Sequence, residues 1–282
     1  MKINVGILVS YDYEFLKNSI PTVYEHADTI TLAIDEGLRT WKGGTFTIDP
    51  SIFTWIETFD TQNKITIYRD NFYIPELSPV DNDTRERNML AARMGDGWTV
   101  QLDADEYFID FKGFVHFLKT SPSVKGRATQ VSALWITLFK QVEDGILYVK
   151  NPEPFQLATN QPDYKKCRNT RQFKVIAPFF VLHQSWARTE GELTKKLSNW
   201  GHVDDFNIEE YITFWKGLNK SNYATVRNFH PMNGKWWKAL DFAEGKGIQE
   251  VLANLKNNLP PINHFWIFKK NLGQKFKFKR FF

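Results

Sequence analysis

Three acidic residues close together have the composition and spacing of a site for a divalent cation. Asp103, Asp105 and Glu106 come directly after the largely apolar run at 98–102, which predicts a buried strand. Carboxylates two residues apart at a strand end can place one side chain on a cation and the other on a ribose hydroxyl or a metal-bound water. Hard oxygen ligands suit Mg²⁺ or Mn²⁺. The alternative is a solvated acidic turn, which is common after a strand.

Two further polar clusters follow predicted strands. Ser10 and Tyr11 come after the first strand, and Asp35 closes the second. In an open α/β sheet, ligands bind beyond the carboxyl ends of the strands. We therefore expect these residues and the acidic cluster to converge on one site, where a cation would accompany a diphosphate.

The elements that must position these residues alternate between strand and helix in the first half of the chain. Strands are predicted at 3–9, 29–34, 64–68, 98–102, 131–139 and 173–176, and a helix at 84–94. A polar, irregular stretch precedes residue 170, and the last third has helical spacing. This order predicts an α/β fold with a Rossmann-like, mostly parallel central sheet, flanking helices and a helical C-terminal region.

The helix and strand around the acidic cluster resemble a known family. The segment 84–92, in the Arg- and Asn-bearing helix, is followed by the segment 97–106, in which the predicted strand leads into Asp-x-Asp at 103–105. This combination looks like that of the family 2 glycosyltransferases, which have the GT-A fold. The resemblance implies an inverting, divalent-metal-dependent enzyme that uses Mn²⁺ or Mg²⁺. It would move a sugar from a nucleotide-sugar donor, with a UDP-sugar favoured, to the hydroxyl of a saccharide or lipid-linked acceptor.

The resemblance also implies which residues bind the donor. Tyr11, beside Ser10, would pack on the nucleobase, and Asp35 would accept hydrogen bonds from it. Arg85 would face the nucleotide or its phosphates, and Asn88 shares the same helix face. Alternatively, Arg85 pairs with an acidic neighbour on the surface.

A second group of residues would serve the metal and the donor sugar. The resemblance implies that Asp105 binds the metal directly, that Asp103 contacts the ribose or a metal-bound water, and that Glu106 orients both or touches the sugar. His183 resembles a third metal ligand, and the alternative is a buried, hydrogen-bonded histidine. Trp186 would then cover the pyrophosphate or the sugar.

Catalysis by inversion also needs a base for the acceptor hydroxyl. Glu190 is the candidate, with Glu153 and Asp163 as rivals, and each could instead be an ordinary surface carboxylate. The predicted division of the chain is a core at 1–190, with a nucleotide-sugar-binding half at 1–110 and an acceptor half at 111–190, and a helical extension at 191–282.

Two other functional classes are open. A sugar nucleotidyltransferase would begin with a Gly-rich phosphate loop, which the segment Val5–Ser10 lacks. A non-catalytic carbohydrate-binding protein could stack exposed aromatic side chains on sugars, but it needs no carboxylates at strand ends.

Composition and charge limit the partners. The net charge is +4, and the aromatic residues before the C-terminal tail are scattered without a basic stripe, so nucleic acid is not expected. Cys167 is the single cysteine, which fits a reducing cytoplasm. From residue 269 to the C-terminus, basic and aromatic residues alternate. This tail predicts either peripheral contact with an anionic inner membrane face or an edge strand or frayed terminus.

Overall fold

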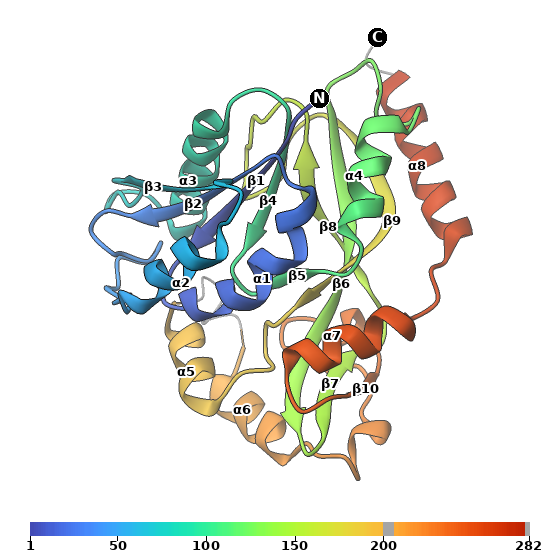
Figure 1. The fold of residues 1–282 in the computed structure, drawn as a ribbon. Helices are drawn as coiled ribbons and strands as arrows, with labels where there is room; N and C mark the ends of the chain where they lie inside the picture. Colours follow the sequence, from blue (N-terminus) through green and yellow to red (C-terminus); the bar gives the residue numbers. More distant parts are fainter. Residues whose placement is uncertain (200–205, 280–282) are drawn as a thin grey trace. The chain divides into compact units, whose positions relative to one another are not determined.

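The computed structural model describes residues 1–199 and 206–279 (Figure 1). The chain forms two compact units. Unit 1 comprises residues 1–133, 154–179 and 262–282, and unit 2 comprises residues 134–153 and 180–261. This division differs from the predicted boundary at residue 190, because the chain leaves unit 1 twice and returns to it.

The bounds of the elements follow the predicted alternation through the first half of the chain. The strands are β1 (Ile3–Val9), β2 (Thr29–Asp35), β3 (Ile65–Asp70), β4 (Trp98–Asp103), β5 (Glu106–Phe108), β6 (Thr129–Val142), β7 (Gly145–Val149), β8 (Glu153–Thr159), β9 (Phe173–His183) and β10 (Leu240–Glu244). The α-helices are α1 (Leu16–Val23), α2 (Ser51–Phe59), α3 (Pro79–Met94), α4 (Phe111–Thr120), α5 (Glu190–Asn199), α6 (Ile208–Gly217), α7 (Ile248–Asn257) and α8 (His264–Lys279).

Unit 1 is built on parallel strands. β1 lies between β2 and β4, and β3 follows β2 at the edge, with each of these neighbours parallel. β8 adds an antiparallel strand beside β4. Every residue of β1 is buried, as expected for a parallel strand with both faces covered. Helices α1, α2 and α3 lie around these strands (Figure 1), and the predicted α/β fold with a mostly parallel sheet is confirmed.

Helix α3 packs closely against β1. A Cβ atom on Gly6 would lie 2.8 Å from the Leu90 side chain, so glycine permits this close approach. The sequence pattern predicts that the helix begins at Thr84, but it begins at Pro79. Ser78 caps the helix by accepting a backbone hydrogen bond from its first turn, and proline suits the first helical position.

Unit 2 combines antiparallel strands with helices. β7 pairs with β6 on one side and with β10 on the other. Its core is aromatic and includes Phe139, Trp186, Trp215, Phe229 and Trp237. The predicted helical C-terminal region therefore also contains a strand, β10, and the predicted irregular stretch before residue 170 contains β7 and β8. β7 has a local signal, since the apolar run at 146–149 follows Asp144 and Gly145 in a hairpin with β6, and the prediction missed it.

The basic and aromatic tail contributes to a helix. Residues 264–279 form α8 in unit 1, so the prediction of an edge strand is wrong for this segment, and residues 280–282 lie outside the described residues. None of the described helices has the length and apolar content needed to cross a membrane.

Candidate active site

The parallel strands of unit 1 bring the strand-end residues to one edge of the sheet. Asp103 lies beside Leu8 in the register of β4 and β1, and Asp35 lies beside Asp70 in the register of β2 and β3. Ser10 immediately follows β1. Because these strands run in the same direction, Ser10, Asp35 and Asp103 all lie at the carboxyl edge, where α/β sheets bind ligands.

Two guanidinium groups hold the carboxylate of Asp103. Arg87 Nη2 lies 2.9 Å from Asp103 Oδ1, and Arg168 Nη2 lies 2.5 Å from Oδ2. Burial alone would raise the pKa of Asp103, but the two positive charges outweigh this effect and lower it. The Asp103 side chain is still 31% exposed. It is therefore an ionised carboxylate that solvent, and a ligand, can reach.

The ion pairs extend to both sides of Asp103. Arg87 Nε also binds Asp83 Oδ1 at 2.6 Å, and Arg168 Nη2 binds Glu106 Oε1 at 2.9 Å. Glu106 Oε2 accepts the backbone N–H of Asp103 at 3.0 Å. Glu106 is fully buried, and this burial raises its pKa although Arg168 acts in the opposite direction. We call these five residues the charged cluster.

The segment that carries Arg168 is held by α3 and by β6. Asn88 Oδ1 accepts the backbone N–H of Tyr164, and Asn88 Nδ2 donates to the Tyr164 carbonyl, both at 3.0 Å. Gln130 Nε2 donates to the carbonyl of Arg168 at 2.5 Å, and its Oε1 accepts the N–H of Thr170 at 3.1 Å. These four bonds place the guanidinium of Arg168 beside the end of β4.

The helix face predicted to meet the donor makes hydrogen bonds to backbone. Arg85 Nη1 donates to the carbonyls of Asn71 and Phe72 at 2.7 Å and 2.9 Å. Arg85 therefore supports the chain after β3, and Asn88 supports the segment that carries Arg168.

Asp35 also supports loops. Its side chain is buried, and each oxygen accepts two backbone N–H groups at 3.0–3.1 Å. The donors are Gly37 and Arg39 for Oδ1, and Phe72 and Tyr73 for Oδ2. Asp35 thus joins the chain after β2 to the chain after β3, a structural task that the predicted nucleobase contact does not require.

The fit of a metal ion depends on how many ligands the protein must supply. Asp105 is 3% exposed, whereas Ser10 and Tyr11 are half-buried. Within residues 1–199 and 206–279, no group of three or more His, Cys, Asp or Glu side chains is placed to hold a metal ion. Mg²⁺ can bind through one or two carboxylates and complete its shell with phosphate oxygens and water. Both oxygens of Asp103 already pair with guanidinium groups, which leaves Asp105 as the carboxylate that fits such a cation.

Two residues of the predicted site, His183 and Trp186, lie in unit 2. The His183 ring stacks on Trp135, with centroids 4.6 Å apart and planes at 30°. Trp186 is 4% exposed and packs edge-on against Tyr211 in the aromatic core. Trp186 is therefore a core residue of unit 2 rather than a cover for the donor.

The three candidates for the base have different surroundings. Glu190 is 65% exposed and pairs with Lys216 at 2.7 Å. Asp163, in unit 1, is equally exposed and pairs with a lysine. Glu153 Oε2 accepts a hydrogen bond from Trp237 Nε1 at 3.1 Å, and burial raises the pKa of this carboxyl group.

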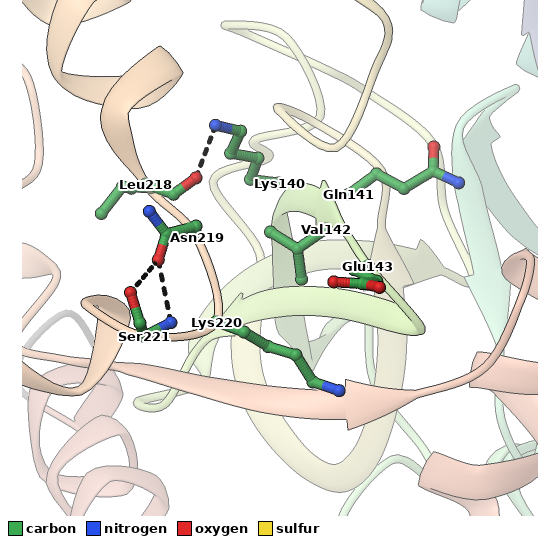
Figure 2. Close-up of a pocket in the computed structure, with 8 residues that line it drawn as sticks. All are labelled: Lys140, Gln141, Val142, Glu143, Leu218, Asn219, Lys220 and Ser221. Carbon is green, nitrogen blue, oxygen red and sulfur yellow. Dashed lines mark hydrogen bonds between the residues drawn. The ribbon is translucent and has the colours of Figure 1, made fainter.

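A cavity of about 420 Å³ in unit 2 has a different character (Figure 2). It is lined by residues 140–143 of β6 and its turn and by residues 218–221 after α6. Lys140 Nζ donates to the carbonyls of Lys216 and Leu218, each at 2.7 Å, and so satisfies the C-terminus of α6. The cavity contains none of the predicted site residues, and Lys140 has a structural role there.

Arg87 and Arg168 are the members of the charged cluster that the predicted site omits, together with Asp83. An Asp four residues before an Arg on a helix is a recognisable pair, so Arg87 had a signal in the sequence. Arg168 lies in the polar stretch that predicts an irregular segment, and nothing in the pattern there identifies it.

Comparison with known proteins leaves the family open. No family model matches the chain, and no curated protein matches it. Among solved structures, the chain is similar to S. aureus TarS, with a TM-score of 0.31 and 12% identity over 51% of this chain and 22% of that one. It is also similar to HddC from Yersinia pseudotuberculosis (TM-score 0.34, 10% identity, 69% and 99% of the two chains) and to a Francisella tularensis cytidylyltransferase (TM-score 0.27, 15% identity, 77% and 88%). These TM-scores lie below 0.5, and no functional conclusion follows from them.

Proposed function

We propose that the protein transfers a sugar from a nucleotide-sugar donor to an acceptor hydroxyl, and that the donor binds at the carboxyl edge of β1, β2 and β4. The charged cluster carries this proposal. Asp103 is 31% exposed, while the side chains of its four partners are at most 8% exposed. Burying so many charges is costly for stability, and such groups with shifted pKa values concentrate at functional sites.

The residues at this edge suit the parts of a nucleotide sugar. The ionised carboxylate of Asp103 can accept hydrogen bonds from ribose hydroxyls, and the half-buried ring of Tyr11 at the end of β1 can pack on a base. The buried Nη1 of Arg87 has no hydrogen-bond partner among the described residues. Leaving this atom unpaired costs about 1–3 kcal/mol, and a cost of this kind is more usual at a functional site than elsewhere.

A divalent cation, Mg²⁺ or Mn²⁺, would be held by Asp105 together with the phosphate oxygens of the donor, while Asp103 would contact the ribose or a metal-bound water. When bound, the cation supplies positive charge against the charge that develops on the departing nucleoside diphosphate. Arg87 and Arg168 keep Asp103 ionised for this contact with the donor. Glu106 positions Asp103 by accepting a hydrogen bond from the backbone N–H of Asp103.

The proposed acceptor is a hydroxyl group of a saccharide or of a lipid-linked molecule. A base must take the proton of this hydroxyl as it attacks the anomeric carbon. Glu190 is the candidate for this base, with Glu153 and Asp163 as rivals.

Hydrolysis and binding of nucleotide sugars test the proposal. The purified protein is incubated with a panel of nucleotide sugars in the presence of Mn²⁺, Mg²⁺ or a chelator, and nucleotide binding is measured by calorimetry. The same assays are made on Asp105→Asn, which keeps the shape of the side chain, and on Asp144→Asn, an exposed carboxylate that pairs with Lys220 in unit 2. Circular dichroism shows whether each variant is folded.

We expect metal-dependent release of one nucleoside diphosphate. Asp105→Asn should lower the rate about a hundredfold, the order seen when one charge-stabilising group is removed, while Asp144→Asn should leave it unchanged. If the folded wild-type protein neither binds nor hydrolyses any nucleotide sugar, the proposal is wrong, and glycan binding without nucleotide would favour the carbohydrate-binding alternative.

A further inference from the structure

Helix α8 is held against β9 by one of its side chains. Asn271 Oδ1 accepts the backbone N–H of Ile176 at 2.8 Å, and Asn271 Nδ2 donates to the Ile176 carbonyl at 2.9 Å. Ile267, one turn earlier, is 7% exposed. These contacts lie within unit 1, and they determine which side of α8 faces the protein.

Four large apolar side chains of α8 are exposed to solvent. They are Phe265 (65%), Phe268 (62%), Leu272 (38%) and Phe276 (63%). With about 100° between successive residues of an α-helix, these four side chains fall within a sector of roughly 80°. They form one row along the helix, which we call the apolar stripe. Single exposed apolar residues are normal, but a contiguous apolar patch marks an interaction surface.

The surroundings of the apolar stripe are basic. Lys269 and Lys275 are exposed and flank the stripe, one on each side of it by helical geometry. Lys269 Nζ lies 4.4 Å from the centroid of the Phe265 ring. The segment 264–279 contains no Asp or Glu, and its lysines are at 269, 270, 275, 277 and 279. A partner must therefore accept both apolar side chains and positive charge.

We propose that α8 lies in the interface of an anionic phospholipid membrane, with the apolar stripe among the acyl chains and Lys269 and Lys275 against the headgroups. A helix with aromatic and leucine side chains on one face and lysines beside them is suited to this position. Anionic headgroups complement the lysines. A second copy docking through the same face would instead bring like charges together. The proposal rests on α8 and is independent of donor binding.

Sedimentation of the full-length protein with phospholipid vesicles tests the proposal. Vesicles of phosphatidylcholine with phosphatidylglycerol are compared with vesicles of phosphatidylcholine alone, at low and high salt. The main variant is Phe265→Ser/Phe268→Ser/Phe276→Ser. The matched control is Ile67→Ser/Leu259→Ser, which removes two other exposed apolar side chains.

We expect the wild-type protein to bind the anionic vesicles and to lose affinity at high salt, because headgroup attraction is screened. The triple serine variant should bind about a hundredfold more weakly, given the apolar burial that each phenylalanine contributes. Lys269→Gln/Lys275→Gln should bind about tenfold more weakly. The serine control should bind like wild type.

Several results would overturn the proposal. One is the absence of wild-type binding to anionic vesicles, and another is equal binding by wild type and the triple serine variant. A third is a wild-type dimer, seen by sedimentation velocity without vesicles, that the triple serine variant abolishes, since the apolar stripe would then be a subunit interface.

Discussion

Replacing Arg168 by methionine should destabilise the fold in a way that depends on pH. Methionine keeps most of the apolar stem of arginine and removes its charge. In the wild-type protein the guanidinium contacts Asp103 at 2.5 Å and Glu106 at 2.9 Å. Asp103 is partly exposed and keeps Arg87, whereas Glu106 is fully buried and loses its positive neighbour. The cost of Arg168→Met should therefore arise mainly at Glu106.

The magnitude follows from the burial of this pair. Removing one partner of a buried ion pair is costly where the other group stays charged, because that charge is left in a medium of low polarity. Burial already raises the pKa of Glu106, and Arg168 lowers it. Without Arg168 the pKa of Glu106 rises further, so the carboxyl group is neutral at low pH. Near about pH 5 this carboxyl group is neutral in both proteins, so the cost should be small. Because the wild-type pKa of Glu106 is about 7, the cost should reach about 1.4 kcal/mol near about pH 8, which corresponds to one pKa unit.

Urea unfolding at both pH values measures this effect. Arg168→Met/Glu106→Gln should recover most of the lost stability at the higher pH, because glutamine needs no positive partner. Arg171→Met, at an exposed neighbouring position, should change stability by about 0.5 kcal/mol or less. The reasoning is refuted if Arg168→Met costs no more than Arg171→Met, or if its cost is the same at both pH values.

Two further predictions concern buried carboxyl groups near the same sheet edge. Burial raises the pKa of Glu86 from 4.5 to about 8, and Trp41 Nε1 donates to Glu86 Oε2 at 2.6 Å. The stability that Glu86 contributes is therefore fully present below pH 4.5 and is lost as the pH rises to about 8. In urea unfolding, Glu86→Gln should make the fall in stability between these pH values smaller by about 4 kcal/mol. A fall as large as that of the wild-type protein would contradict the assignment. Asp35→Asn should lower the free energy of unfolding by about 3 kcal/mol, because the new amide group faces two N–H donors. Thermal or urea unfolding measures this loss. A loss smaller than that of an exposed Asp→Asn change would show that the four backbone hydrogen bonds contribute little.

The sequence pattern is sufficient for the parallel strands and for the carboxylates at their ends. The apolar run at 3–9 predicts β1 with its observed bounds, and β2 and β4 differ from prediction by one residue at the C-terminus. Buried parallel strands are continuous apolar runs, so local sequence identifies them. Asp35 and Asp103 are therefore placed at one edge before any tertiary contact is known.

The partners of these carboxylates are decided by the folded chain. Arg168 reaches Asp103 only because Asn88 and Gln130 hold a distant, polar segment beside β4. No local pattern encodes such bonds, since each joins residues far apart in the sequence. The family resemblance implies that Arg85 faces the donor, and Asn88 shares its helix face; in the structure both side chains donate to backbone carbonyls.

Helix α8 illustrates the same limit in secondary structure. Its alternating basic and aromatic residues have the period of a strand, and the local pattern therefore favours an edge strand. The folded chain instead buries Ile267 and joins Asn271 to the backbone of β9, and both contacts need helical spacing. The burial of one segment can be predicted from the residues of that segment. Ion pairs, and the packing of a helix against a distant strand, depend on neighbours that only the tertiary structure supplies.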